Sequence, residues 1–152
     1  MKLASFLAAD RVVLNFTAAS TRDTLEQLVA PLVKADIVAD AKQFMADLLR
    51  REAEITTVMD NGVALPHARS NAVRRLGLTV GIAAEPGIQY SPESPTRSRL
   101  FFCIAVPGYA PTAHIPLLQA LAKFSREPSR VDKLLHSKSA SVAARYLINF
   151  KS

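Results

Sequence analysis

The sequence has no tryptophan and a single cysteine, and each shortage excludes a class of protein. One thiol, at Cys103, cannot form an internal disulfide, so we expect a reducing compartment. The three tyrosines are not interleaved with basic residues, as a base-stacking surface for nucleic acid requires. Lysine and arginine are instead spread along the chain, and we expect no nucleic-acid partner despite the formal charge of +6.

The sequence also lacks an apolar run long enough for a transmembrane helix, which needs about 20 residues. Its longest apolar runs, residues 78–84 and 100–106, have the length of strands. Residues 1–9 contain a lysine and a short apolar stretch, but this stretch ends at Asp10 and is too short for a signal peptide. We therefore expect a cytoplasmic protein that does not insert into a membrane.

Segments of two kinds alternate along the 152 residues, whose 49% hydrophobic content suits one globular domain. The predicted strands are β-branched or continuously apolar: 12–16, 55–58, 63–65, 78–84 and 100–106, with a short edge strand near 88–90. The predicted helices have one apolar face and cover 21–35, 40–53, a segment starting near 112, and segments starting at 128 and 139. Pro31 is expected to kink or end the first helix early.

This mixture predicts the α/β class, with one domain spanning residues 1–152. We expect a mixed β-sheet of about four to five strands, covered by helices on both faces.

The segment 51–69 combines residues that suit chemistry on an anion. His67 directly follows Pro66 at the end of an extended apolar stretch, and proline restricts the backbone, so the imidazole is held in a defined direction. Gly62 permits a tight turn or a close backbone approach to an anion. Thr56 and Thr57 bring hydroxyls, and Arg51 brings a planar fork of donors that fits phosphate.

An imidazole has a reference pKa of about 6.5, so much of it is neutral and nucleophilic near pH 7. Attack on a phosphoryl group needs alignment and donors around the phosphoryl oxygens more than covalent help. Each residue also has a structural interpretation: His67 as a partly buried histidine bonded to backbone, and Arg51 as a cation that a helix C-terminus favours. For the two threonines, the structural interpretation is β propensity alone.

Taken together, the segment resembles the signature of the fructose–mannitol type enzyme IIA domains of the bacterial phosphotransferase system, a group that includes the nitrogen-related regulatory enzyme IIA. The matching parts occur in the same order and spacing: Arg51-Glu52, Thr56-Thr57, Asn61-Gly62 and Ala64-Leu65-Pro66-His67. Residues 100–107 resemble the family's buried strand ending in Val-Pro, and His114 resembles its second histidine, which opens a leucine-rich helix. The resemblance covers essentially the whole chain.

The resemblance implies a phosphocarrier in which His67 is phosphorylated, at Nε2, beside His114, with Arg51, Thr56, Thr57 and Gly62 as phosphate-supporting residues. It implies an HPr-like protein as donor, and an enzyme IIB cysteine or a regulatory target as acceptor. It implies no cofactor and no metal. Docking of a donor is expected to use apolar contact, or acidic residues near the site such as Glu52, Glu54 and Asp60.

The chain departs from the family at Val58-Met59-Asp60, where glycines are usual, and at Ala68, where glycine is frequent. Three functions are consistent with these residues. We favour a regulatory phosphocarrier of the nitrogen-related branch over a sugar-specific one, and an inactive interaction module is the third. Elsewhere, Cys103 is expected to be inert core, His136 a solvated helix-end residue, and a metal on His67 and His114 lacks an evident third ligand.

Overall fold

A mixed five-stranded sheet forms the middle of the computed structural model, which describes residues 2–59 and 61–151. Its strands are β1 (Val12–Phe16), β2 (Val63–Ala64), β3 (His67–Ser70), β4 (Gly77–Ala83) and β5 (Leu100–Pro107). β1 pairs in parallel with β4, and β4 pairs antiparallel with β5. β2 and β3 both pair in parallel with β5, so together they form the edge of the sheet opposite β1.

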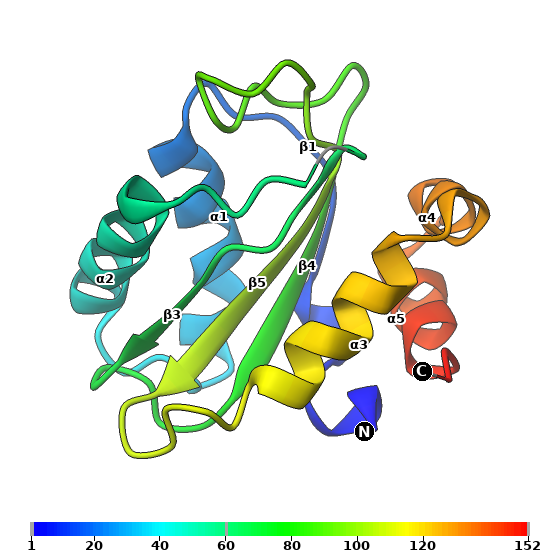
Figure 1. Cartoon of the computed structure of the whole chain (residues 1–152). Coiled ribbons are helices and arrows are strands. Elements are labelled where there is room, and N and C mark those ends of the chain that lie inside the picture. Colours follow the sequence, from blue (N-terminus) through cyan, green and yellow to red (C-terminus); the bar gives the residue numbers. More distant parts are fainter. Residues whose placement is uncertain (1, 60, 152) are drawn as a thin grey trace.

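Helices cover both faces of this sheet (Figure 1). One face carries α1 (Thr21–Lys34) and α2 (Ala41–Glu54), and the other carries α3 (Ile115–Ser125), α4 (Pro128–Leu135) and α5 (Ala140–Ile148). Two short 3-10 helices, Leu3–Ser5 and Ala9–Arg11, precede β1. The predicted α/β class and two-sided helix packing are confirmed. Within the described ranges, none of the helices combines the length and apolar character that crossing a bilayer requires.

β5 separates two hydrophobic cores, because successive side chains of a strand point to opposite faces. Leu100 and Phe102 pack into the core under α3, α4 and α5, whereas Phe101 and Cys103 pack into the core under α1 and α2. Every residue of β4 and β5 is buried. Burial on both faces explains why these two strands are continuous apolar runs in the sequence rather than alternating ones.

Side-chain capping explains where two of the helices start. Asp40 and Ser139 accept hydrogen bonds from backbone N–H groups three residues later and so cap α2 and α5. α3 begins at Ile115, slightly later than predicted, with a proline in its first turn. Pro31 does not end α1, which continues to Lys34. The fully buried Leu32 lies just beyond the proline, and its packing offsets the lost backbone hydrogen bond.

Two predicted strands do not form. Residues 55–58 make only one isolated bridge, between Val58 and Ala64, and residues 88–90 make only the bridge between Ile88 and Ser98. In the first segment, the backbone N–H of Thr57 is bonded to a side chain and is therefore not available to a strand ladder. β propensity predicted extended backbone here correctly, but pairing depended on a neighbour that the sequence does not specify.

Candidate functional site

Two histidines that are distant in the sequence lie side by side at the surface of the sheet edge. His67 is the first residue of β3 and is in register with Ile104 of β5. His114 is the residue that directly precedes α3, and its side chain makes no capping hydrogen bond to the helix. The two ring centroids are 5.6 Å apart, with the ring planes 37° apart. The fold thus brings together the two histidines that the sequence analysis selected.

The ring of His67 is oriented by its own backbone. Its Nδ1 lies 2.7 Å from the carbonyl oxygen of Leu65, across the intervening Pro66. A carbonyl oxygen accepts hydrogen bonds and cannot donate them, so Nδ1 must carry the proton. In the neutral ring the other nitrogen, Nε2, then holds the free lone pair. The nucleophilic atom is therefore determined by a local backbone contact.

Partial burial lowers the pKa of His67 below its ordinary value, and the nearby positive charge of Arg51 lowers it further. Two contacts act against this change: the hydrogen bond to Leu65 and the negative charge of Glu52 both raise the pKa. The net effect is a lowered pKa, so the imidazole is neutral at pH 7. A neutral ring is the form that can attack phosphorus.

His114 is also held in its neutral form. Burial lowers its pKa, and its neighbour His67 lowers it further. Its Nδ1 is buried and has no hydrogen-bond partner among the described residues. Because α3 starts immediately after it, the positive end of the helix dipole lies beside the histidine pair and favours an anion there. No group of three or more metal-ligating side chains occurs within residues 2–59 and 61–151.

Arg51 lies in the last turn of α2 and serves two purposes. One of its terminal nitrogens donates a hydrogen bond of 2.8 Å to the carbonyl of Ile55, the residue that ends the helix. Its charge also lowers the pKa of His67. Arg51 can therefore be both a cation at the helix C-terminus and a donor to phosphate, because a guanidinium has five N–H donors.

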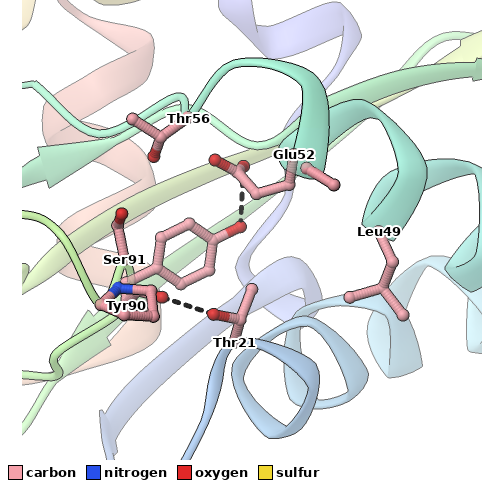
Figure 2. Close-up of a pocket in the computed structure, with 8 residues that line it drawn as sticks. Thr21, Leu49, Glu52, Thr56, Tyr90 and Ser91 are labelled. Carbon is pink, nitrogen blue, oxygen red and sulfur yellow. Dashed lines mark hydrogen bonds between the residues drawn. The ribbon is translucent and has the colours of Figure 1, made fainter.

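The two threonines differ in what they contact. Both donors of Thr57 are bonded to Glu52: the backbone N–H to Oε2 at 2.6 Å, and the hydroxyl to Oε1 at 2.6 Å. The hydroxyl of Thr56 accepts a bond from the backbone N–H of Val58 and lines a small cavity beside Glu52 and Tyr90 (Figure 2). In this structure the hydroxyl of Thr57 is therefore occupied by Glu52, and its backbone carbonyl accepts a hydrogen bond from Leu65, two residues before His67.

The sequence did not indicate that Glu52 has a structural role, and it indicated no role at all for Tyr90. Glu52 was predicted as an acidic docking residue, but its carboxylate is bonded within the chain to Thr57 and Tyr90. The adjacent arginine in the sequence was the one signal that marked Glu52. Tyr90 lies in a proline-rich loop, and no motif marked it. Of the other two predicted docking acids, Glu54 is exposed, and Asp60 lies outside the described residues.

Gly62 enables the turn into β2. Its φ of +81° lies in the left-handed region, which a side chain disfavours. Its carbonyl accepts a hydrogen bond of 2.9 Å from the backbone N–H of Arg99, next to the start of β5. Asn61, beside it, donates through its side chain to the carbonyl of Ser125 at the end of α3. The turn between the two threonines and His67 is thus attached to the sheet and to α3.

The family model described as "Phosphoenolpyruvate-dependent sugar phosphotransferase system, EIIA 2" matches residues 5–149. The chain belongs to this family. Enzyme IIA components are phosphotransferases that transfer phosphate through a phosphohistidine. A fructose-specific EIIA component of Haloferax volcanii is 31% identical over 121 residues, which are 80% of this chain and 78% of that protein. This enzyme IIA also spans 22% and 18% of the length of two longer relatives, both EIIABC components.

Solved structures with the same fold come from both branches of the family. Nitrogen regulatory protein IIA-Ntr from Neisseria meningitidis has a TM-score of 0.79 at 22% identity, over 95% of this chain and 98% of that chain. The IIA-mannitol component in its complex with phosphorylated IIB-mannitol from Escherichia coli has a TM-score of 0.80 at 21% identity, over 95% and 98%. These likenesses support the enzyme IIA fold alone, so the predicted preference for the nitrogen-related branch is not confirmed.

Two remaining residues that the sequence singled out lie outside the histidine pair. Cys103 is fully buried in β5, and burial raises the pKa of its thiol to about 12, as an inert core residue requires. His136 is exposed at the end of α4, where its Nδ1 donates to the carbonyl of Asp132 at 2.8 Å. Neither side chain contributes to the histidine pair.

Proposed function

We propose that His67 accepts the phosphoryl group on Nε2, and that residues 1–152 act as one phosphocarrier domain. The observation that carries this proposal is the bond from Nδ1 to the Leu65 carbonyl, which leaves the lone pair on Nε2. This lone pair forms the new N–P bond while the P–N bond of the donor's phosphohistidine breaks. The bonding electrons leave with the donor imidazole. The Leu65 carbonyl stabilises the positive charge that His67 gains in this step.

The neighbouring groups suit the dianion that results. His114 is close enough to donate from its ring to a phosphoryl oxygen, and the N-terminus of α3 adds a positive dipole. Arg51 adds a full positive charge whose effect reaches His67. Thr57, Thr56 and Gly62 support the site by shaping the segment that leads to it. The transfer uses side chains and backbone throughout, so the proposal includes no cofactor and no metal.

We infer that the donor is an HPr-like phosphocarrier protein and that the acceptor is a cysteine of an enzyme IIB domain. The support for a sugar-transport acceptor is the fructose-specific relative at 31% identity. The alternative acceptor is a regulatory target protein of the nitrogen-related branch, which would use the same imidazole.

Incubation with phosphoenolpyruvate, enzyme I and an HPr protein tests the proposed site. The wild-type chain should gain one acid-labile phosphate, and H67A should gain none. H136A is the matched control, because His136 is exposed and remote on α4, and it should be labelled fully. Full labelling of H67A would refute the assignment. Absence of label on the wild-type chain with every HPr-like donor would favour the inactive interaction module.

The acceptor is identified by following the label onward. Transfer from the phosphorylated chain to a purified IIB domain of fructose or mannitol type supports the sugar-transport acceptor. Failure to phosphorylate any IIB domain, together with binding of a target protein that changes with phosphorylation, supports the regulatory acceptor.

A further inference from the structure

Tyr90 is not part of the histidine pair, yet its hydroxyl points at Glu52, at the end of α2 (Figure 2). Tyr90 belongs to the loop between β4 and β5, and only 1% of its surface is exposed. Its hydroxyl donates a hydrogen bond of 3.0 Å to Oε1 of Glu52. A buried hydroxyl that donates to a carboxylate makes a strong, charge-assisted bond.

The ring of Tyr90 is firmly placed. It packs edge-on against Phe101 of β5, with ring centroids 5.4 Å apart and planes 70° apart. Its backbone carbonyl accepts a hydrogen bond from the hydroxyl of Thr21, the first residue of α1. Burial, followed by the negative charge of Glu52, raises the pKa of Tyr90 far above its ordinary value, so the hydroxyl stays protonated as a donor. The carboxylate of Glu52 is thus attached to the core.

Hydrogen bonds continue from Glu52 to the site. Glu52 accepts from both donors of Thr57, and the Thr57 carbonyl in turn accepts from the backbone N–H of Leu65 at 3.2 Å. The Leu65 carbonyl then accepts from Nδ1 of His67 at 2.7 Å. An unbroken series of hydrogen bonds therefore connects the buried tyrosine to the imidazole.

We propose that Tyr90 is a positioning residue: through Glu52 and Thr57 it holds the Leu65 carbonyl that orients the His67 ring. The loop from Ile55 to Met59 pairs with residues 63–65 only through the bridge at Val58 and the two backbone bonds beside it, so the side-chain bonds to Glu52 add to its attachment. The expected effect of Tyr90 on the rate of phosphoryl transfer rests on the proposed function of His67. Its expected effect on which ring nitrogen of His67 carries the proton does not depend on that function.

The variant Y90F tests this, because it removes one oxygen and keeps the buried ring. In nitrogen NMR spectra at about pH 8, where both histidines are neutral, wild-type His67 should show a proton on Nδ1 alone. Y90F should show a mixture of the two tautomers. In transfer from a phosphorylated HPr protein, kcat should fall roughly tenfold while KM stays within about twofold, because the docking surface is unchanged.

Y146F is the matched control, since Tyr146 lies on α5, on the opposite face of the sheet, and should behave as wild type in both assays. E52Q is the second variant. It introduces an amide donor opposite the two donors of Thr57 and should produce the same tautomer mixture.

A wild-type tautomer signal in both Y90F and E52Q would overturn the positioning proposal. The proposal is also overturned if Y90F and E52Q change the tautomer ratio and kcat no more than Y146F does. If the wild-type chain accepts no phosphoryl group at all, the proposed function fails, while the NMR signal still decides whether Tyr90 positions the ring.

Discussion

The adjacent arginines Arg50 and Arg51 allow the site to be separated from the scaffold, because their side chains bond to different parts of the fold. Arg51 bonds to the carbonyl of Ile55 beside the site, and Arg50 bonds to the carboxylate of Asp47. Each arginine thus contributes one hydrogen bond from a side chain that is not fully buried. Such a bond adds about 1 kcal/mol to stability.

R51A and R50A should therefore lose similar amounts of unfolding free energy, about 1 kcal/mol each. The loss in R50A stays small because Asp47 keeps two bonds from Gln43, and because Arg50 is 68% exposed and screened by solvent. Urea unfolding, followed by circular dichroism, measures both values. Equal stability losses make the two variants a matched pair for the kinetic comparison.

Their phosphoryl uptake should differ strongly. R51A removes a positive charge that acts at His67, and loss of one such group from a transition state costs about 10²–10³-fold in rate. R50A leaves that charge in place and should retain most of the wild-type rate. Single-turnover labelling from a phosphorylated HPr protein measures the two rates. Equal rates in R51A and R50A would refute the placement of Arg51 in the site.

The pH–rate profile of phosphate uptake should have its midpoint below about pH 6.5, the ordinary pKa of a histidine, because burial lowers the pKa of His67 and the neutral ring is the reactive form; a midpoint above this pH would contradict it. G62A should lose about 1–2 kcal/mol of unfolding free energy, since an L-residue is strained at a φ of +81°; an unchanged urea midpoint would show that the turn relaxes. The thiol of Cys103 should not react with a disulfide reagent in the native chain but should react fully in guanidinium, because it is buried with a pKa of about 12; rapid native labelling would rule out the core placement.

Local chemistry in the sequence was sufficient for most secondary structure. The apolar runs of β4 and β5 predicted strands, and two helices begin as predicted at positions 40 and 139, where Asp40 and Ser139 are the capping residues. These features depend on neighbours a few residues away, so a pattern of residue types is enough to specify them. Pro31 shows where local patterns fail to predict a helix end, because tertiary packing of Leu32 stabilises α1 beyond the proline.

The candidate site was only half predictable from the sequence. The order of Arg51, Thr57, Pro66 and His67 indicated the family. Leu65, which orients the His67 ring, lies within the same short segment. The partnership of His67 with His114 required β3 and α3 to meet, which depends on the sheet order. Tyr90 carried no local signal, because a tyrosine in a loop is ordinary until a carboxylate from another helix lies 3.0 Å from its hydroxyl.

The physical reason for this division is range. Helix capping, the pattern of apolar residues and turn chemistry act between residues that are close along the chain. The amino-acid sequence alone therefore determines them. The bond from Tyr90 to Glu52 and the placement of the two imidazoles depend on contacts between distant segments. Only packing of α1 and α2 on one face and α3 on the other brings those segments together.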